Sequence, residues 1–210
     1  MTIIVHHLQD SRSQRVLWLL EELGVAYEIK RYERNPMTRL APPELLAIHP
    51  LGKSPMITIN GVVIAETGAI FEALLDRFDT EHRLHPARDH ADYETHRYWM
   101  HYAEGSAMPP LVMKLIMGMI PDQTGPAFGF VEAQIALHLK YQESVVVEKG
   151  GFTGSTFSAA DIIMSFPIEA ANVRANLAET APKLAEWLAV VRARPSYRAA
   201  LDKGGSYSFA

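Results

Sequence analysis

The chain contains no cysteine among its 210 residues. This absence excludes a disulfide framework, a cysteine nucleophile, a CxxC redox pair and a zinc site built on thiolates. Any thiol chemistry that the protein performs therefore needs a thiol that a ligand brings.

An excess of one charge sign and long apolar segments are also lacking. The 20 basic and 24 acidic residues give a formal net charge of -4, and no Lys/Arg block marks a tail that binds nucleic acid or membranes. The most apolar stretch, residues 111–120, is interrupted by Lys114 and is too short to span a bilayer. The first residues lack the features of a signal peptide, so we expect a cytoplasmic protein with no membrane span and no nucleic-acid partner.

Several catalytic and metal-binding motifs are missing. Residues 52–54 resemble the end of a phosphate-binding loop, but Pro50 and Pro55 exclude both the loop and the helix that would follow it. The chain has no HExxH and no G-x-S-x-G motif. His82 and His85 lie in a polar stretch without a carboxylate-rich surrounding, so we expect no metal site.

The first part of the chain alternates strand and helix patterns. Asn60-Gly61 lies between two apolar runs and is the strongest hairpin signal, because both turn residues need a positive φ. Strand, helix and strand joined by short connections imply a right-handed unit with parallel strands. The expected elements are, in order, a strand at 3–5, a helix that ends at Gly24, a strand at 27–30, a short helix after 42–43, strands at 56–59 and 62–64, and a helix up to 79.

From about residue 90 onward the pattern is helical. Apolar residues recur at helical spacing in two segments, 128–139 and 184–191. Residues 145–147 suit either a strand or the end of a helix. We therefore predict an α/β domain over residues 1–82, followed by an all-α domain over 88–210.

Two features of the helical half have structural explanations. Ser158 and Asp161 form a capping box before an apolar run, in which each side chain accepts a hydrogen bond from the backbone amide of the other. A cluster of methionines suits either an ordinary core helix or an adaptable apolar wall of a ligand cleft. These methionines are Met108, Met113, Met117 and Met119.

Three short segments of the first domain suit a small polar ligand. Ser11 follows the first strand and precedes the first helix, where a hydroxyl caps the helix or, with the helix dipole, stabilises an anion. Ser54-Pro55 precedes a strand, and a cis bond there leaves the backbone of residue 54 open. Glu66-Thr67 begins a helix whose free amides would bind a carboxylate. A ligand with a thiol, a peptide backbone and terminal carboxylates fits all three segments, and glutathione is such a ligand.

These segments, in this order, resemble those of glutathione transferases over nearly the whole chain. Residues 11–17 are similar to the catalytic-serine segment of that family, 49–55 to its cis-proline segment, 66–70 to its γ-glutamyl-binding segment and 158–162 to its capping box. Residues 102–106 with 109–110, and residues 164–167, are similar to a bacterial and fungal subgroup typified by a yeast membrane-associated glutathione transferase.

The resemblance implies a thioredoxin-like first domain, an all-helical second domain, a homodimer, and glutathione as the substrate with no metal. It places Ser11 as the hydrogen-bond donor to the glutathione thiolate, while the proximity of Ser13 leaves the choice between the two serines open. The other implied site residues are Lys53 for the glycyl carboxylate, the backbone of Ser54 before Pro55 for the cysteinyl residue, Glu66 and Thr67 for the γ-glutamyl end, and Tyr102, Ser106 and Met108 near the electrophile.

Two functions of different classes are compatible with the sequence. The first is an enzyme that transfers glutathione to small hydrophobic electrophiles, with peroxidase activity toward organic hydroperoxides as a second reaction. The alternative is a non-catalytic protein of this fold that binds ligands or partners, since a fold does not fix a function. Ser11, Ser54-Pro55 and Glu66-Thr67 are all present, and this intact set favours the enzyme.

Overall fold

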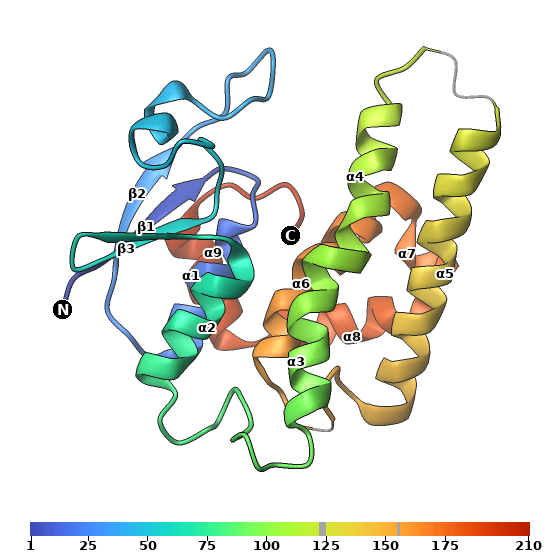
Figure 1. The fold of residues 1–210 in the computed structure, drawn as a ribbon. Coiled ribbons are helices and arrows are strands. Elements are labelled where there is room, and N and C mark those ends of the chain that lie inside the picture. The colour runs from blue at the N-terminus through green and yellow to red at the C-terminus, as the bar shows by residue number, and fades with distance from the viewer. Residues whose placement is uncertain (122–124, 155) are drawn as a thin grey trace. The chain divides into compact units, whose positions relative to one another are not determined.

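Two units divide the chain in the computed structural model, which describes residues 1–121, 125–154 and 156–210 (Figure 1). The first unit comprises residues 1–83, 193–208 and 210, and the second comprises residues 84–192 and 209. The helix near the C-terminal end of the chain is therefore part of the first unit.

A four-stranded mixed sheet forms the centre of the first unit, with the strand order β2-β1-β3-β4. The strands are β1 (Ile3–Leu8), β2 (Glu28–Tyr32), β3 (Met56–Ile59) and β4 (Val62–Ala65). β1 and β2 are parallel, whereas β3 is antiparallel to both β1 and β4. The predicted parallel unit and the predicted hairpin are both confirmed.

The turns of this unit follow from local chemistry. Asn60 and Gly61 join β3 to β4 with φ of 48° and 84°, as a tight hairpin with two left-handed residues requires. Gly24 ends the first helix with φ of 66°, and its amide donates to carbonyls of the last turn. The residue types at these positions predict both turns.

Helices cover the sheet of the first unit. The helices are α1 (Ser13–Leu23), the short 3-10 helix η1 (Pro43–Ala47), α2 (Thr67–Phe78) and α9 (Pro195–Gly204). α1 and α2 contact the sheet, and α9 packs along α1 (Figure 1). On another part of the sheet, Leu45 of η1 is buried with Leu8, Tyr32 and Met56.

The contact between α1 and α9 is both apolar and ionic. The rings of Trp18 and Tyr197 meet edge to face with their centroids 5.0 Å apart. Glu22 accepts a hydrogen bond from Arg194 at 2.6 Å and another from Trp18 at 3.1 Å. These contacts fix α9 against α1, whose N-terminal end carries the residues singled out in the sequence.

The second unit is helical in the part of the chain that the structure describes. Its elements are α3 (Tyr93–Tyr102), the π-helix η2 (Ala103–Ala107), α4 (Met108–Met117), α5 (Pro126–Lys149), α6 (Ala159–Ala175), α7 (Leu177–Thr180) and α8 (Pro182–Arg192). Residues 145–147, which suited either structure, are helical and lie in α5. The predicted order, an α/β unit followed by an all-α unit, is confirmed.

The predicted capping box opens α6. Asp161 accepts hydrogen bonds from the amide of Ser158 at 2.8 Å and from the amide of Phe152 at 3.0 Å. Ser158 Oγ accepts from the amide of Ala160 at 3.3 Å, and both halves of the box are present. Because Asp161 is only 1% exposed, this one carboxylate ties the preceding loop to the start of a buried helix.

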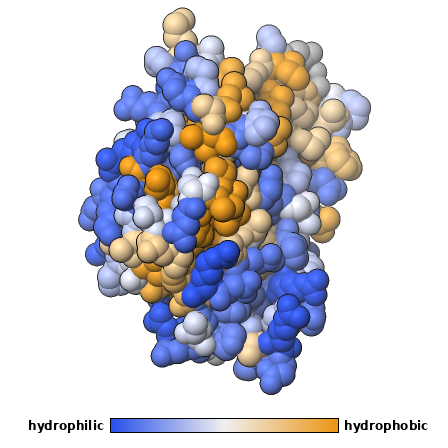
Figure 2. All heavy atoms as spheres, turned by 60° about the vertical axis from the view of Figure 1, so that its left-hand side comes forward, coloured by the Kyte–Doolittle hydropathy of each residue, from blue (hydrophilic) through white to orange (hydrophobic). Residues whose placement is uncertain are grey.

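Hydrophilic side chains cover most of the face drawn in Figure 2, and apolar side chains gather mainly in its upper half. Among the described residues, no helix combines the length and the apolar character that crossing a membrane requires.

Candidate active site

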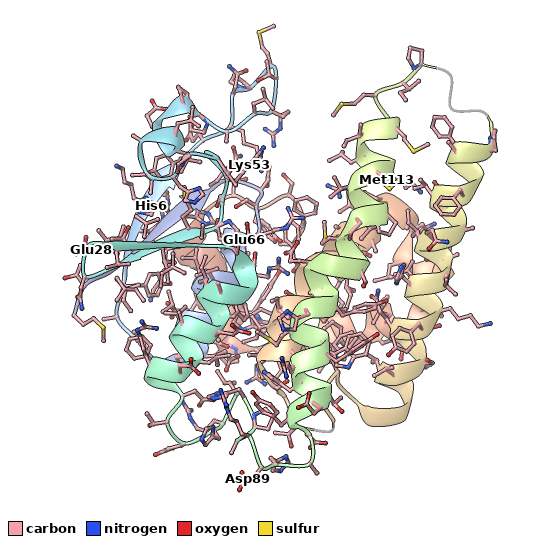
Figure 3. The ribbon with its side chains drawn as sticks, viewed as in Figure 1. His6, Glu28, Lys53, Glu66, Asp89 and Met113 are labelled. Carbon is pink, nitrogen blue, oxygen red and sulfur yellow. The ribbon has the colours of Figure 1, made fainter. Side chains whose placement is uncertain are left out.

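The strand pairing brings the three predicted ligand-binding segments to one end of the sheet. His6 near the end of β1 pairs with Met56 at the start of β3, because these strands are antiparallel. Met56 in turn pairs with Ala65, the last residue of β4. The loop after β1, the loop before β3 and the start of α2 therefore meet, and Figure 3 shows Lys53 and Glu66 at this end of the sheet.

Ser11 lies in the loop between β1 and α1. The helix begins at Ser13 with Arg12 as its N-cap residue, so Ser11 lies one residue before the cap. Ser11 Oγ accepts a hydrogen bond from the amide of Ser13 at 3.2 Å. The same oxygen lies 2.7 Å from Ser13 Oγ and 3.2 Å from Ser54 Oγ. The structure thus joins Ser11 to the segment before β3.

Ser13 occupies a different environment from Ser11. Its side chain is fully buried, and its Oγ lies 2.9 Å from His7 Nδ1. Ser13 Oγ also accepts from the amide of Leu8 at 3.2 Å. These contacts leave Ser13 enclosed between β1 and α1, whereas Ser11 contacts the half-buried Ser54.

The bond between Ser54 and Pro55 is cis, as the resemblance to glutathione transferases implies. Ser54 Oγ donates to the backbone carbonyl of His6 at 3.4 Å, and Pro55 is buried. The preceding residue, Lys53, is exposed.

Glu66 and Thr67 begin α2 at the same end of the sheet. Glu66 is the N-cap residue with a positive φ of 72°, and its side chain makes no cap hydrogen bond. The first amides of the helix therefore point toward this end of the sheet without a side-chain cap. Thr67 is buried, and its Oγ1 lies 3.5 Å from the guanidinium of Arg15.

Arg12 is a charged residue of this region to which no sequence motif assigns a role. Burial lowers the pKa of the Arg12 guanidinium, whereas the neighbouring Glu66 and Tyr207 raise it. Glu66 thus has a cation near its carboxylate, and Tyr207 comes from the segment after α9. The position of Arg12 directly after Ser11 could have indicated that Arg12 lies in this region. Tyr207 is too far along the chain for any local sequence pattern to connect it with Ser11.

Arg34 holds the loop that carries Ser11. Its guanidinium donates to the backbone carbonyl of Gln9 at 2.9 Å, to that of Asp10 at 3.2 Å and to that of Arg39 at 2.9 Å. One side chain therefore ties residues 9–10 to the segment after β2. Several bonds from one planar group restrict the position of a loop more than one bond does.

Asp10 adds a second restraint to the same loop. Its carboxylate accepts from Arg39 at 2.7 Å and from the backbone amide of Ser208 at 2.7 Å. The C-terminal segment of the chain is therefore bonded to the residue before Ser11.

The chemical groups at this end of the sheet are hydroxyls, helix amides and the carboxylate of Glu66, which lies near the guanidinium of Arg12. Among the described residues, no three or more His, Asp and Glu side chains are arranged to hold a metal ion. The hydroxyls and amides suit anionic groups, and the carboxylate of Glu66 suits an ammonium group.

Two of the three predicted electrophile-site residues share one hollow in the helical unit. Tyr102 and Ser106 line a space of about 620 Å³, together with residues of α3 and η2. Met108 is only 2% exposed and is not among the residues lining this hollow. Met108 is therefore a buried residue at the start of α4, directly after η2.

The hydroxyl of Tyr102 is held within the helical unit. It lies 2.5 Å from His138 Nδ1, and burial raises the pKa of Tyr102 to about 12. Burial also lowers the pKa of His138. Both shifts favour a neutral tyrosine that donates to a neutral imidazole.

A small mixed sheet with a cis-proline before β3, joined to an all-helical unit, defines the architecture of glutathione S-transferases. The family model "Glutathione S-transferase, N-terminal domain" matches residues 1–75. Glutathione S-transferase 3 of Schizosaccharomyces pombe is 35% identical over 96% of this chain and 87% of its own length. Glutathione S-transferase 1 of Saccharomyces cerevisiae is 33% identical over 96% of this chain and 94% of its own.

A solved structure agrees with these sequence relatives. A glutathione S-transferase from Actinobacillus pleuropneumoniae superposes with a TM-score of 0.91 at 33% identity, covering 99% of this chain and 95% of its own. The chain belongs to the glutathione S-transferase family.

Proposed function

We propose that the protein transfers glutathione to small hydrophobic electrophiles and that Ser11 stabilises the reacting thiolate. The observation that carries this proposal is the contact between Ser11 Oγ and Ser54 Oγ at 3.2 Å, directly before the cis-proline. The serine hydroxyl and the backbone segment that would hold the cysteinyl residue of glutathione are thus neighbours.

Each end of glutathione has partners of complementary chemistry. The backbone of Ser54 would pair with the cysteinyl residue as an added strand pairs with a sheet edge. The carboxylate of Glu66 would bind the γ-glutamyl ammonium, and the first amides of α2 with the Thr67 hydroxyl would bind the γ-glutamyl carboxylate. The exposed Lys53 is the proposed partner of the glycyl carboxylate.

The role of Ser11 is electrostatic. A free thiol of this kind has a pKa of about 8.5, so a shift of one to two units makes the thiolate prevalent near neutral pH. One unit corresponds to about 1.4 kcal/mol, and a hydrogen bond to a charged group contributes about 1.5–3 kcal/mol. The hydroxyl of Ser11 and the nearby N-terminus of α1 are therefore sufficient, and Ser11 keeps its own proton.

The thiolate would then attack the electrophilic carbon, with the new C–S bond formed as the leaving group departs with its electron pair. For the electrophile we propose Tyr102 and Ser106, which line one hollow of the helical unit. Because Tyr102 is bonded to His138, it would present mainly its ring, and Ser106 would present a hydroxyl.

A titration with glutathione near neutral pH tests the proposal, with the ultraviolet absorbance of the thiolate as the signal. We expect a saturable thiolate band, and no band with S-methylglutathione, which has no ionisable thiol. Calorimetric binding of glutathione without the band would contradict thiol activation and favour the non-catalytic alternative. The absence of any binding would contradict the proposed ligand itself.

A further inference from the structure

The two histidines of β1 point to opposite faces of the sheet, as neighbours in a strand do. His6 lies 3.0 Å from the hydroxyl of Tyr32 and 2.9 Å from Thr58 Oγ1. His7 instead lies 2.9 Å from Ser13 Oγ at the start of α1. Of the two imidazoles, His7 is therefore the one bonded to a direct neighbour of Ser11.

The environment of His7 favours the neutral imidazole. The side chain is only 3% exposed, and burial together with the charge of Arg31 lowers the pKa of His7 to about 4. The backbone of Gly204 forms a hydrogen bond that opposes this shift, which identifies its carbonyl as the acceptor. We assign the single ring proton to Nε2, facing that carbonyl, so that Nδ1 is an acceptor for Ser13.

This assignment fixes the direction of the next hydrogen bonds. The hydroxyl of Ser13 has one hydrogen and two acceptors, His7 Nδ1 at 2.9 Å and the backbone carbonyl of Leu8 at 3.4 Å, and we assign the hydrogen to the nearer acceptor, His7. Ser13 Oγ is then an acceptor, and it receives the amide of Leu8 at 3.2 Å and the hydroxyl hydrogen of Ser11 at 2.7 Å. The other acceptor near Ser11, Ser54 Oγ, is farther away at 3.2 Å. The hydrogen of Ser11 therefore points toward Ser13.

We propose that His7 acts through Ser13 as a positioning residue that opposes thiolate formation, because it makes Ser13 Oγ compete with the thiolate for the hydrogen of Ser11. The inference rests on the proposed function, in which Ser11 donates to the thiolate. When Ser11 donates its hydrogen to the thiolate, the oxygens of Ser11 and Ser13, which lie 2.7 Å apart, no longer share that hydrogen. Ser13 can then donate to Ser11 only if it gives up its hydrogen bond to His7. Without an acceptor at position 7, Ser13 gives up only the longer contact with the Leu8 carbonyl when it donates to Ser11. A chain of hydrogen bonds directed at the thiolate then strengthens the bond from Ser11 to the thiolate.

The test is the pKa of the glutathione thiol bound to His7→Phe, measured from the thiolate absorbance across pH. Loss of one neutral hydrogen bond that competes with the thiolate is worth about a fivefold change in an equilibrium. We therefore expect about fivefold more thiolate at pH values well below the wild-type midpoint, with unchanged affinity for S-methylglutathione. His6→Phe is the matched control, since its side-chain partners do not contact Ser11, and we expect the wild-type pKa.

An unchanged or raised thiol pKa in His7→Phe would overturn the proposal, because a packing role predicts one of these two results. Should that variant fail to fold, Ser13→Ala decides, since it removes the competing acceptor itself. A lowered pKa in Ser13→Ala supports the proposal, and an unchanged or raised pKa contradicts it. Ser11→Ala separates the two proposals: if glutathione binds and its pKa is unaltered there, the proposed role of Ser11 has failed, whatever His7 does.

Discussion

The hydroxyl oxygens of Ser11 and Ser54 lie 3.2 Å apart although 43 positions separate these residues in the chain. The antiparallel pairing of β1 with β3 produces this contact, because it places the end of one strand beside the start of the other. A ligand held by the backbone of Ser54 therefore lies within reach of Ser11. The predictions that follow concern this arrangement and the stability of the fold that maintains it.

Replacing Ser11 with alanine removes the proposed donor to the thiolate. A hydrogen bond to a charged group contributes about 1.5–3 kcal/mol, so we expect the pKa of the bound thiol to rise by about one to two units. The rate of transfer to a chloronitrobenzene electrophile should fall by about tenfold or more near neutral pH. Affinity for S-methylglutathione should stay within about twofold of wild type, since that ligand has no thiolate to stabilise.

The control for this variant is Ser144→Ala, an exposed serine of α5 whose hydroxyl donates to the carbonyl of Tyr141. It should show the wild-type thiol pKa and rate. A Ser11→Ala protein with the same thiol pKa as Ser144→Ala would remove Ser11 from the mechanism.

Replacing Glu66 with glutamine should weaken the binding of glutathione without abolishing thiol activation. Loss of a charge-assisted hydrogen bond to the γ-glutamyl ammonium costs about 1.5 kcal/mol or more, which corresponds to about tenfold in affinity. Calorimetry measures this change, and Glu72→Gln, an exposed carboxylate of α2, is the matched control. Equal affinities in the two variants would exclude Glu66 from the γ-glutamyl site.

Features of the fold that depend on neighbouring residues were predictable from the sequence. Asn60-Gly61 and Gly24 adopt the left-handed φ values that their residue types favour, and the box of Ser158 and Asp161 forms as its spacing indicates. In each case the interacting groups lie within a few residues of one another, so the pattern carries the information.

Contacts between distant segments were not predictable in this way. The ring of His7 is hydrogen-bonded to the backbone of Gly204, and the carboxylate of Asp10 accepts a hydrogen bond from the amide of Ser208. Both contacts form only because α9 packs along α1. Similarly, no local pattern indicates that Tyr102 is bonded to His138. The sequence thus points to the three segments that the sheet brings together, whereas the residues that support these segments required the tertiary structure.

Replacing Asp161 with alanine should destabilise the protein strongly. The substitution leaves the buried amides of Ser158 and Phe152 without their acceptor, and each such loss costs about 1–3 kcal/mol. We therefore expect the free energy of unfolding, measured with a chemical denaturant, to fall by about 2–4 kcal/mol. Asp76→Ala, at an exposed position of α2, should change it by less than about 0.5 kcal/mol. Similar values for the two variants would contradict the role of Asp161 as the central acceptor of the box.

The buried neutral imidazole of His7 predicts how stability depends on pH. The pKa of His7 is about 4 in the folded protein, against 6.5 for an unperturbed histidine. Above 6.5 the side chain is neutral in both states and makes no difference. As the pH falls from 6.5 toward 4, His7 becomes protonated in the unfolded state but stays neutral in the folded state, so the free energy of unfolding decreases.

The total loss from this one group is about 3 kcal/mol, because one pKa unit corresponds to about 1.4 kcal/mol. Denaturant unfolding of wild type and His7→Phe at several pH values measures it, since the difference between the two proteins isolates His7 from all other titrating groups. We expect the wild type to lose stability more steeply than the variant over this range, with the two slopes equal above it. Parallel curves throughout would show that His7 takes up its proton equally well in the folded and unfolded states, which would contradict the lowered pKa of His7 in the folded protein.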